Sequence, residues 1–300
     1  MKRFFSLFML GFAAVPGALA CNMASADRFE LVADLVEAGH ECLQNLPEGF
    51  TFDTQMEADF IERINDARRA EGVPELTIRE GLIAPARFHS LDMAYNDFFG
   101  HDSPAGRRAA DRIAAFDRTL IADFTAENVA TESHKCTDGV GRSVPCGPGQ
   151  SRPPSETLRH LHNGLMDSPG HRANILSEHA TSLALGVVRR ENGVFVTQLF
   201  ANAAGELLEP APLRAAPGSE LKLSVTLPDW STAHFAVVQD DIQIDLKKGR
   251  LPTSLKGDFM LQVRGENKTT STRSGGRIVQ SCETIELPGP ALTVVPATGS

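Results

Sequence analysis

Beyond its first twenty residues, the sequence has no apolar run approaching the roughly 20 residues that a membrane-spanning helix requires. It also has no Gly-x-Ser-x-Gly, His-Glu-x-x-His or Cys-x-x-Cys motif, the patterns typical of serine hydrolases, zinc peptidases and thiol redox proteins. No internal repeat occurs. These absences exclude a protein that crosses a membrane with helices after its first twenty residues, and they leave no standard nucleophile motif.

The first twenty residues are typical of a secretory signal peptide. A basic start is followed by an apolar run over residues 4–15 and by a small-residue cleavage site at residues 18–20. The sequence therefore predicts an exported protein, located in the periplasm or outside the cell.

The charge balance is acidic. Removing the signal peptide leaves 27 basic residues against 38 acidic residues, a net charge of −11. Such a balance favours solubility and argues against binding nucleic acid or anionic lipid through a basic surface. We expect no nucleic-acid partner.

Five cysteines follow the signal peptide, and an exported protein is expected to pair them where it can. Cys136 and Cys146 flank a loop rich in Gly, Pro and Ser, so we predict that they form a disulfide. Cys42 and Cys282 would be a second pair only if two domains dock closely.

Cys21 directly follows the predicted cleavage site. A bacterial lipoprotein carries its lipid on a cysteine at this place, but the site also fits an ordinary signal-peptidase cut. Lipidation of Cys21 and a non-lipidated secreted form both stay open, and a lipid on Cys21 is the only membrane attachment that we expect.

Helical periodicity dominates the first part of the chain. After a weakly structured lead-in over residues 21–53 with one short amphipathic helix, the pattern indicates a domain over residues 54–205. Its expected helices and strands are helices near 54–72, 79–96, 109–115 and 155–166, and strands at 183–189 and 194–200.

The pattern of apolar residues changes after Asn202. A Pro- and Ala-rich linker over residues 206–218 precedes a region in which apolar residues alternate at 221–227, 242–246 and 259–263. Alternation of this kind predicts strands, and we expect residues 219–300 to form a small sandwich-like all-β domain.

Several segments of the first domain resemble the CAP superfamily of cysteine-rich secretory, antigen 5 and pathogenesis-related 1 proteins, in its bacterial SCP-domain form. The resemblance covers about residues 55–202 and implies an α-β-α sandwich, so the whole chain is predicted to be α+β. The segments occur in the family's order: "FIERINDARRAEGVPELTI", "ARFHSLDMAYNDFFGHDSPAGRRAADRI", "AENVA", "DSPGHRANIL", "LALGVV" and "VFVTQLFA".

The resemblance also implies a cleft. Family members line it with two His and two Glu that can hold a divalent cation, and His101 and Glu127 match one of each. The other two places fall near Ser168 and at Phe195, so half of the set is missing. The bacterial "SPGHR" turn supplies His171 instead, and we expect it to face the same cleft.

Two imidazoles and a carboxylate can ligate Zn²⁺ and leave one position open. We therefore consider a weakly bound zinc on His101 and His171 beside Glu127, with no cofactor assigned firmly. A structural role for each of the three residues stays open. His89 belongs to the same region, but its place on an apolar helix face favours a core histidine. His160 and His162 are expected at the surface.

These observations favour a non-catalytic, exported binding module with a His- and Glu-lined cleft. Its ligand would be a small molecule, lipid or protein outside the cell or in the cell envelope. The alternatives are a metal-assisted peptidase that uses His101, Glu127 and His171, and a structural envelope module with a vestigial cleft.

Overall fold

The computed structural model describes residues 21, 23, 29–133, 135–137, 139–145, 152–191, 193–274 and 277–296. The predicted signal peptide at residues 1–20 and Cys146 lie outside these residues, as does the side chain of Cys282. Among the described residues, no helix is both long enough and apolar enough to span a lipid bilayer.

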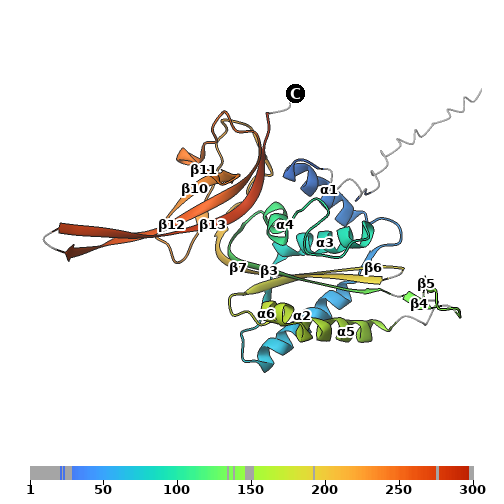
Figure 1. Ribbon diagram of the computed structural model, residues 1–300. Helices are drawn as coiled ribbons and strands as arrows, with labels where there is room; N and C mark the ends of the chain where they lie inside the picture. The colour runs from blue at the N-terminus through green and yellow to red at the C-terminus, as the bar shows by residue number, and fades with distance from the viewer. Residues whose placement is uncertain are drawn as a thin grey trace, which may run out of the picture.

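A six-stranded sheet lies between two layers of helices (Figure 1). Its strands are β1 (Thr51–Phe52), β2 (Thr77–Ile78), β3 (Leu120–Ser133), β6 (Ser182–Arg190), β7 (Gly193–Leu207) and β9 (Val225–Thr226). The order is β1-β6-β7-β3, with β2 beside β6 and β9 beside β7. All pairs are antiparallel except β2 with β6.

The helices are α1 (Val32–Gln44), α2 (Thr54–Ala70), α3 (Ile83–Tyr95), α4 (Ala109–Phe116), α5 (Pro154–Asp167) and α6 (Pro169–Ile175), with a short 3-10 turn at Glu80–Leu82 before α3. Helices α2, α5 and α6 cover one face of the sheet, while α1, α3 and α4 cover the other (Figure 1). The predicted α-β-α sandwich is confirmed.

Local sequence explains these boundaries. Asp53 begins α2 because its side chain accepts a hydrogen bond from the Met56 amide at 2.9 Å, the arrangement of an N-cap. Pro169 occupies the first turn of α6, where its missing N–H costs nothing. The "SPG" segment predicted as a turn therefore starts a short helix. Strands β6 and β7 are apolar on both faces because helices cover both.

Helix α3 approaches the sheet closely at Gly186 of β6. A Cβ atom at Gly186 would lie 2.3 Å from the backbone carbonyl of Ala86. Next to this contact, the Ser90 hydroxyl donates to the Gly186 carbonyl at 2.8 Å and lies 2.8 Å from Thr197 Oγ1. A glycine is thus required where α3 rests on β6.

A two-stranded hairpin of short strands, β4 (Lys135–Thr137) and β5 (Ser143–Pro145), follows β3. It lies within the polar segment 132–154, which joins β3 to α5. The N-terminal end of this segment therefore forms a local hairpin.

The C-terminal region is a single five-stranded sheet of order β11-β10-β12-β13-β8. Its strands are β8 (Arg214–Ala215), β10 (Thr232–Gln239), β11 (Ile242–Asp245), β12 (Gly257–Ser274) and β13 (Arg277–Val294). The hairpin of β12 and β13 projects far beyond the other strands (Figure 1). The all-β character is confirmed, but one sheet replaces the expected pair of a sandwich.

The strand predicted at 221–227 is wrong except at Val225–Thr226, which forms β9 and joins the first sheet. Upstream, the Leu223 amide bonds the Leu221 carbonyl at 3.1 Å, and the Leu221 amide bonds the Gly249 carbonyl at 2.8 Å. The alternating leucines thus pack on the C-terminal core without joining a ladder.

Helix α1 connects the two regions. Its first amides are bonded by side chains of the C-terminal sheet, Val32 N by Asp258 Oδ2 at 2.8 Å and Ala33 N by Thr293 Oγ1 at 3.0 Å. These bonds satisfy amides that a helix leaves unpaired at its start. The amphipathic helix expected in the lead-in is confirmed as α1, a 13-residue helix with a buried apolar face.

Cys21 forms a disulfide with Cys42 of α1. This bond excludes the Cys42–Cys282 pair, which we considered only for the case that two domains dock closely. It also contradicts lipidation of Cys21, since a sulfur in a disulfide cannot carry a thioether. Cys136 is disulfide-bonded, but Cys146 lies outside the described residues, so the Cys136–Cys146 pair stays a prediction.

Candidate functional site

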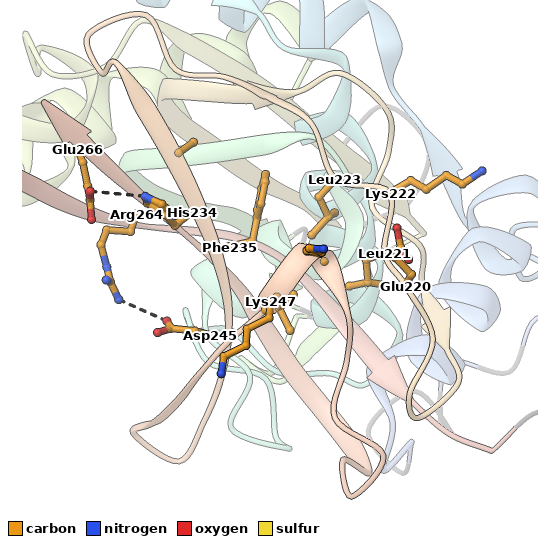
Figure 2. A pocket seen from close by; sticks show the side chains of 14 residues that line it. Glu220, Leu221, Lys222, Leu223, His234, Phe235, Asp245, Lys247, Arg264 and Glu266 are labelled. Carbon is orange, nitrogen blue, oxygen red and sulfur yellow. Dashed lines mark hydrogen bonds and ion pairs between the residues drawn. The ribbon is translucent and has the colours of Figure 1, made fainter. Parts of the chain in front are cut away.

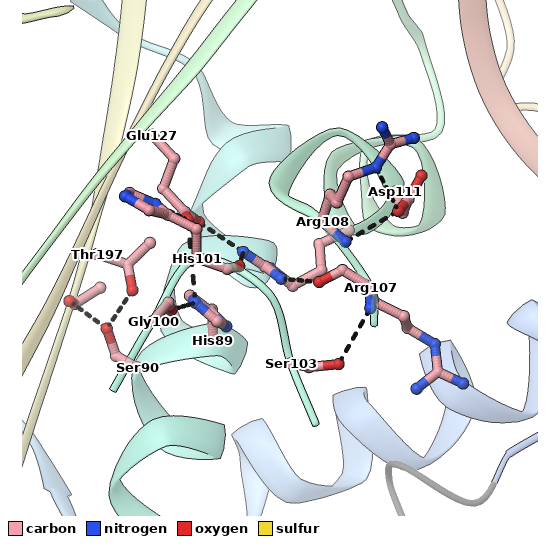
Figure 3. A network of polar contacts seen from close by, with 12 residues as sticks. His89, Ser90, Gly100, His101, Ser103, Arg107, Arg108, Asp111, Glu127 and Thr197 are labelled. Atoms are coloured by element: carbon pink, nitrogen blue, oxygen red, sulfur yellow. Dashed lines mark hydrogen bonds and ion pairs between the residues drawn. The ribbon is translucent and has the colours of Figure 1, made fainter. Parts of the chain in front are cut away.

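His101 and Glu127 form the centre of the candidate site (Figure 3). His101 lies in the loop between α3 and α4, and Glu127 lies on β3. Nδ1 of His101 is 2.9 Å from Glu127 Oε1. The imidazole is 53% exposed, whereas the carboxylate is only 2% exposed. A buried carboxylate therefore orients a half-exposed imidazole.

The loop that carries His101 is held by other groups. Ser103 accepts hydrogen bonds from the Gly106 amide through its carbonyl at 2.7 Å and from the Arg107 amide through its hydroxyl at 3.3 Å. The imidazole of His101 is not needed for this turn. Its hydrogen bond to Glu127 favours a role in the candidate site over a role in stabilising the turn.

Arg112 of α4 completes the buried part of the site. Its Nη2 donates to Glu127 Oε2 at 2.7 Å and to the His101 carbonyl at 2.9 Å, and its Nη1 donates to the Arg107 carbonyl at 2.7 Å. The side chain is 1% exposed. Both oxygens of Glu127 are thus bonded, one by an imidazole and one by a guanidinium (Figure 3).

These contacts set the protonation of the pair. Burial alone would raise the pKa of Glu127, but the hydrogen bond from His101 and the charge of Arg112 bring it below its ordinary value. The hydrogen bond to Glu127 raises the pKa of His101 despite partial burial. The geometry favours a carboxylate beside an imidazole that holds its proton.

His171 lies beside His101, with ring centroids 6.4 Å apart. Two asparagines fix α6 against β3: Asn128 Nδ2 donates to the His171 carbonyl at 3.1 Å, and Asn174 Nδ2 donates to the Glu127 carbonyl at 3.2 Å. Burial and the neighbouring His101 lower the pKa of His171. The structure therefore brings His101, Glu127 and His171 together, and the two imidazoles differ in proton affinity.

His89 lies behind the pair and is fully buried. Its Nε2 lies 2.9 Å from the Gly100 carbonyl and 3.9 Å from Glu127 Oε1. Since a carbonyl only accepts, Nε2 must carry the proton, and buried Nδ1 has no hydrogen-bond partner among the described residues. Burial lowers the pKa of His89 to about 4. The predicted core histidine is confirmed, and it contacts the loop that carries His101.

His89 predicts an acid-sensitive step in stability. An unfolded histidine takes up its proton near pH 6.5, but folded His89 does so only near its pKa of about 4. Between these values the unfolded state binds more protons, so the free energy of unfolding should fall as the pH falls. In urea titrations at pH 6.5, 5.5 and 4.5, His89→Gln should flatten this slope. His160→Gln on the exposed face of α5 is the matched control, and equal slopes for His89→Gln and the wild type would contradict the assignment.

The residues do not fit the considered three-ligand zinc site. Glu127 already accepts from Arg112 and His101, and a guanidinium 2.7 Å from the carboxylate opposes a cation there. Within the described part of the chain, no group of three or more His, Cys, Asp or Glu side chains is placed to hold a metal ion. The buried carboxylate of Glu127 forms an ion pair with Arg112 instead.

Other predicted positions differ in outcome. Phe195, at the place of the family's second histidine, is 6% exposed and lies under the Arg190 guanidinium at 4.9 Å. Ser168 joins α5 to α6. Arg172 pairs with Glu71 at 2.7 Å. The surface expectation for His162 is wrong: it is buried, with its ring 6.5 Å from that of Phe60.

The sequence interpretation missed Arg112 and the amide network of Asn128, Asn174 and Gln198. Asn128 Nδ2 also lies 3.1 Å from Gln198 Oε1, and Asn174 Nδ2 donates to Asn128 Oδ1 at 2.9 Å. The only signal for Arg112 is its helical position beside Ile113, one turn before Phe116 on the buried side of α4. For an arginine, that position alone predicts a solvated side chain.

Comparison with known proteins identifies relatives of the first domain. Residues 61–200 match the family model "CAP: Cysteine-rich secretory protein family". The "Uncharacterized protein YkwD" of Bacillus subtilis (strain 168) is 32% identical over 144 residues, which are 48% of this chain and 46% of that protein. The chain therefore spans about half the length of this relative.

Two solved structures are also similar. One is an extracellular protein containing an SCP domain from Bacillus anthracis str. Ames, with 27% identity, a TM-score of 0.38, and coverage of 50% of this chain and 41% of that chain. The other is an outer surface protein from Borrelia burgdorferi, with 18% identity, a TM-score of 0.39, and coverage of 50% of this chain and 96% of that chain.

Proposed function

Because residues 61–200 of this chain match the CAP family model, we propose that the protein is an exported, non-catalytic binding module. In this proposal, His101 and His171 contact a ligand outside the cell or in the cell envelope. The ligand presents a hydrogen-bond-accepting, negatively charged group such as a carboxylate.

One observation carries the proposal: both oxygens of Glu127 are bonded in the interior, to His101 and to Arg112. The carboxylate is therefore not free to ligate a metal or to take a substrate proton. Its role is to orient His101 and to keep a proton on it. In the described residues, no hydroxyl or thiol is hydrogen-bonded to the imidazole of His101 or His171, so a serine- or cysteine-type nucleophile lacks its base.

The protonation of His101 gives the preference for an anion. Since Glu127 raises the pKa of His101, the exposed imidazole is a charged donor to higher pH than an ordinary histidine. Binding of a carboxylate should strengthen as the pH falls through that raised pKa. His171, whose pKa is lowered, stays a neutral neighbour over the same range.

We expect acetate and benzoate to shift the histidine C2-proton NMR signals of His101 and His171 saturably in the mature chain. His101→Ala should abolish the response at His171, and His160→Ala outside the site should preserve it. Glu127→Gln should move the titration of His101 to lower pH. No saturable shift of either signal, or a response that grows as the pH rises, would contradict anion recognition.

The alternative is a hydrolase, and one feature favours it. A buried carboxylate bonded to Nδ1 of an imidazole is also how catalytic triads orient a general base. A peptide-library assay of the same purified chain, with metal analysis, separates the two functions. We expect neither turnover nor stoichiometric zinc; cleavage lost in both His101→Ala and Glu127→Gln would favour the hydrolase.

A further inference from the structure

The C-terminal sheet has a cavity of about 710 Å³ outside the region that matches the CAP family (Figure 2). It lies between strands β10 to β12, the segment 220–223 and the turn at 245–249. Its volume is within the range of about 300–1,000 Å³ typical of small-molecule sites. None of the residues of the first site lines it.

Part of the inner surface of the cavity is apolar. Leu221 is buried, while Leu223 and Phe235 are partly exposed and rest on the C-terminal core. Figure 2 shows Leu223 and Phe235 in the middle of the cavity, between the charged groups at its edges. This part of the cavity would accept an aromatic ring or a short alkyl chain.

The acidic groups at the rim are already paired. Each of them lies within 4 Å of a basic side chain: Glu220 with Arg250 at 3.6 Å, Asp245 with Arg264 at 3.4 Å, and Glu266 with His234 at 3.5 Å. Arginines therefore compensate the negative charge of Glu220 and Asp245, whereas His234 compensates Glu266 only when it is protonated.

The lysines at the rim are not paired. Among the residues that the structure describes, no carboxylate forms an ion pair with Lys222, Lys247 or Lys248. The chain after the signal peptide has only six lysines, and these three line one cavity. On a protein with a strong excess of acidic residues, this rim is a local concentration of uncompensated positive charge.

The turn that carries Lys247 and Lys248 has an unusual backbone conformation. Lys248 and Gly249 both have positive φ, 55° and 71°. A Cβ at Gly249 would lie 2.3 Å from the Leu221 carbonyl, and the Gly249 carbonyl accepts from the Leu221 amide at 2.8 Å. A positive φ is uncommon for lysine, so the turn is fixed by its contact with Leu221.

We propose that this cavity binds a small amphiphilic anion, whose carboxylate or phosphate contacts the lysines and whose apolar part rests on Leu223 and Phe235. This site is independent of the His101 site and goes beyond the function proposed above. The lysines favour an anion through charge complementarity, and the apolar surface of Leu223 and Phe235 favours a ligand that also has an apolar part.

The test measures binding of decanoate and decyl phosphate to the full mature chain by isothermal titration calorimetry, below the micelle concentrations. The variant Lys222→Gln/Lys247→Gln/Lys248→Asn removes the charges, and asparagine tolerates the positive φ at 248. We expect affinity for both anions to fall about tenfold or more, since charge-assisted bonds are the strong ones. Lys256→Gln, at an exposed lysine outside the cavity, is the matched control, and fluorescence of the single tryptophan, Trp230, reports folding of this domain.

Several results would overturn the proposal. Absence of saturable binding of both anions, equal binding of decyltrimethylammonium, or unchanged affinity in the triple variant would each contradict it. If inorganic phosphate bound as tightly as decyl phosphate, the apolar surface of Leu223 and Phe235 would contribute nothing to the affinity. Binding confined to vesicles of anionic lipid would replace the cavity with a flat membrane-binding surface. Loss of the NMR response at His101 and His171 would leave this test unaffected.

Discussion

Replacing Arg112 with methionine is expected to lower the free energy of unfolding by about 3–5 kcal/mol, the cost of leaving one partner of a buried ion pair alone. Methionine keeps most of the volume but removes the donors to Glu127 and to the carbonyls of His101 and Arg107. The carboxylate then remains buried with His101 as its main partner. Urea or thermal unfolding at neutral pH measures the loss.

Arg108→Met on the same helix is the matched control. Arg108 is 72% exposed and its pair with Asp111 spans 3.5 Å, so its loss should change stability by about 0.5 kcal/mol or less. Similar effects of the two substitutions would show that the buried pair is not structurally important. A second readout is specific to the site: without the charge of Arg112, which lowers the pKa of His101, that pKa should rise.

Replacing Gly186 with alanine is expected to destabilise the domain by about 3 kcal/mol or more, at the upper end of overpacking effects. The added methyl would lie 2.3 Å from the Ala86 carbonyl group, and neither backbone can rotate away as a side chain can. Helix α3 would have to move off β6, which also disturbs the Ser90 bond to the Gly186 carbonyl. Thermal unfolding monitored by circular dichroism measures the change.

Gly164→Ala makes the same chemical change, but we expect it to raise the stability of the domain rather than to lower it. Gly164 is exposed within α5, and a Cβ there would meet nothing within 4 Å. Alanine should stabilise that helix by about 0.5–1 kcal/mol relative to glycine. If Gly186→Ala were tolerated as well as Gly164→Ala, the close approach of α3 to β6 would be disproved.

The α-β-α region was predictable from the sequence because its helices and strands carry their own periodicity. The apolar spacing in α2 and α4 and the apolar runs of β6 and β7 each identify one buried surface. The strand prediction for the leucines at 221–227 was wrong because an alternating pattern indicates only which side chains are buried. It does not indicate whether a neighbouring strand is available for backbone pairing. The amphipathic face of α1 was predictable, but its capping by Asp258 and Thr293 was not, because these residues lie more than two hundred positions away in the sequence.

The candidate site was also predictable only in part from the sequence. His101, Glu127 and His171 were found because they stand in motifs, and their neighbourhood in the structure agrees with that expectation. Arg112 carries no motif, and an arginine in a helix is usually solvated. Its burial follows only from the acceptors that β3 and the loop between α3 and α4 place around it, and no local pattern in the sequence encodes such an arrangement.

The capping of α1 by the C-terminal sheet has a consequence for the order of folding. The partners of its first two amides are 226 and 260 residues further along the chain. A ribosome releases the helix first and its caps last, so the N-terminal helix stays incompletely capped until nearly the whole polypeptide has been made. The first helix that the structure describes is thereby among the last to be completed, and a chain that stops after β7 would never acquire these caps.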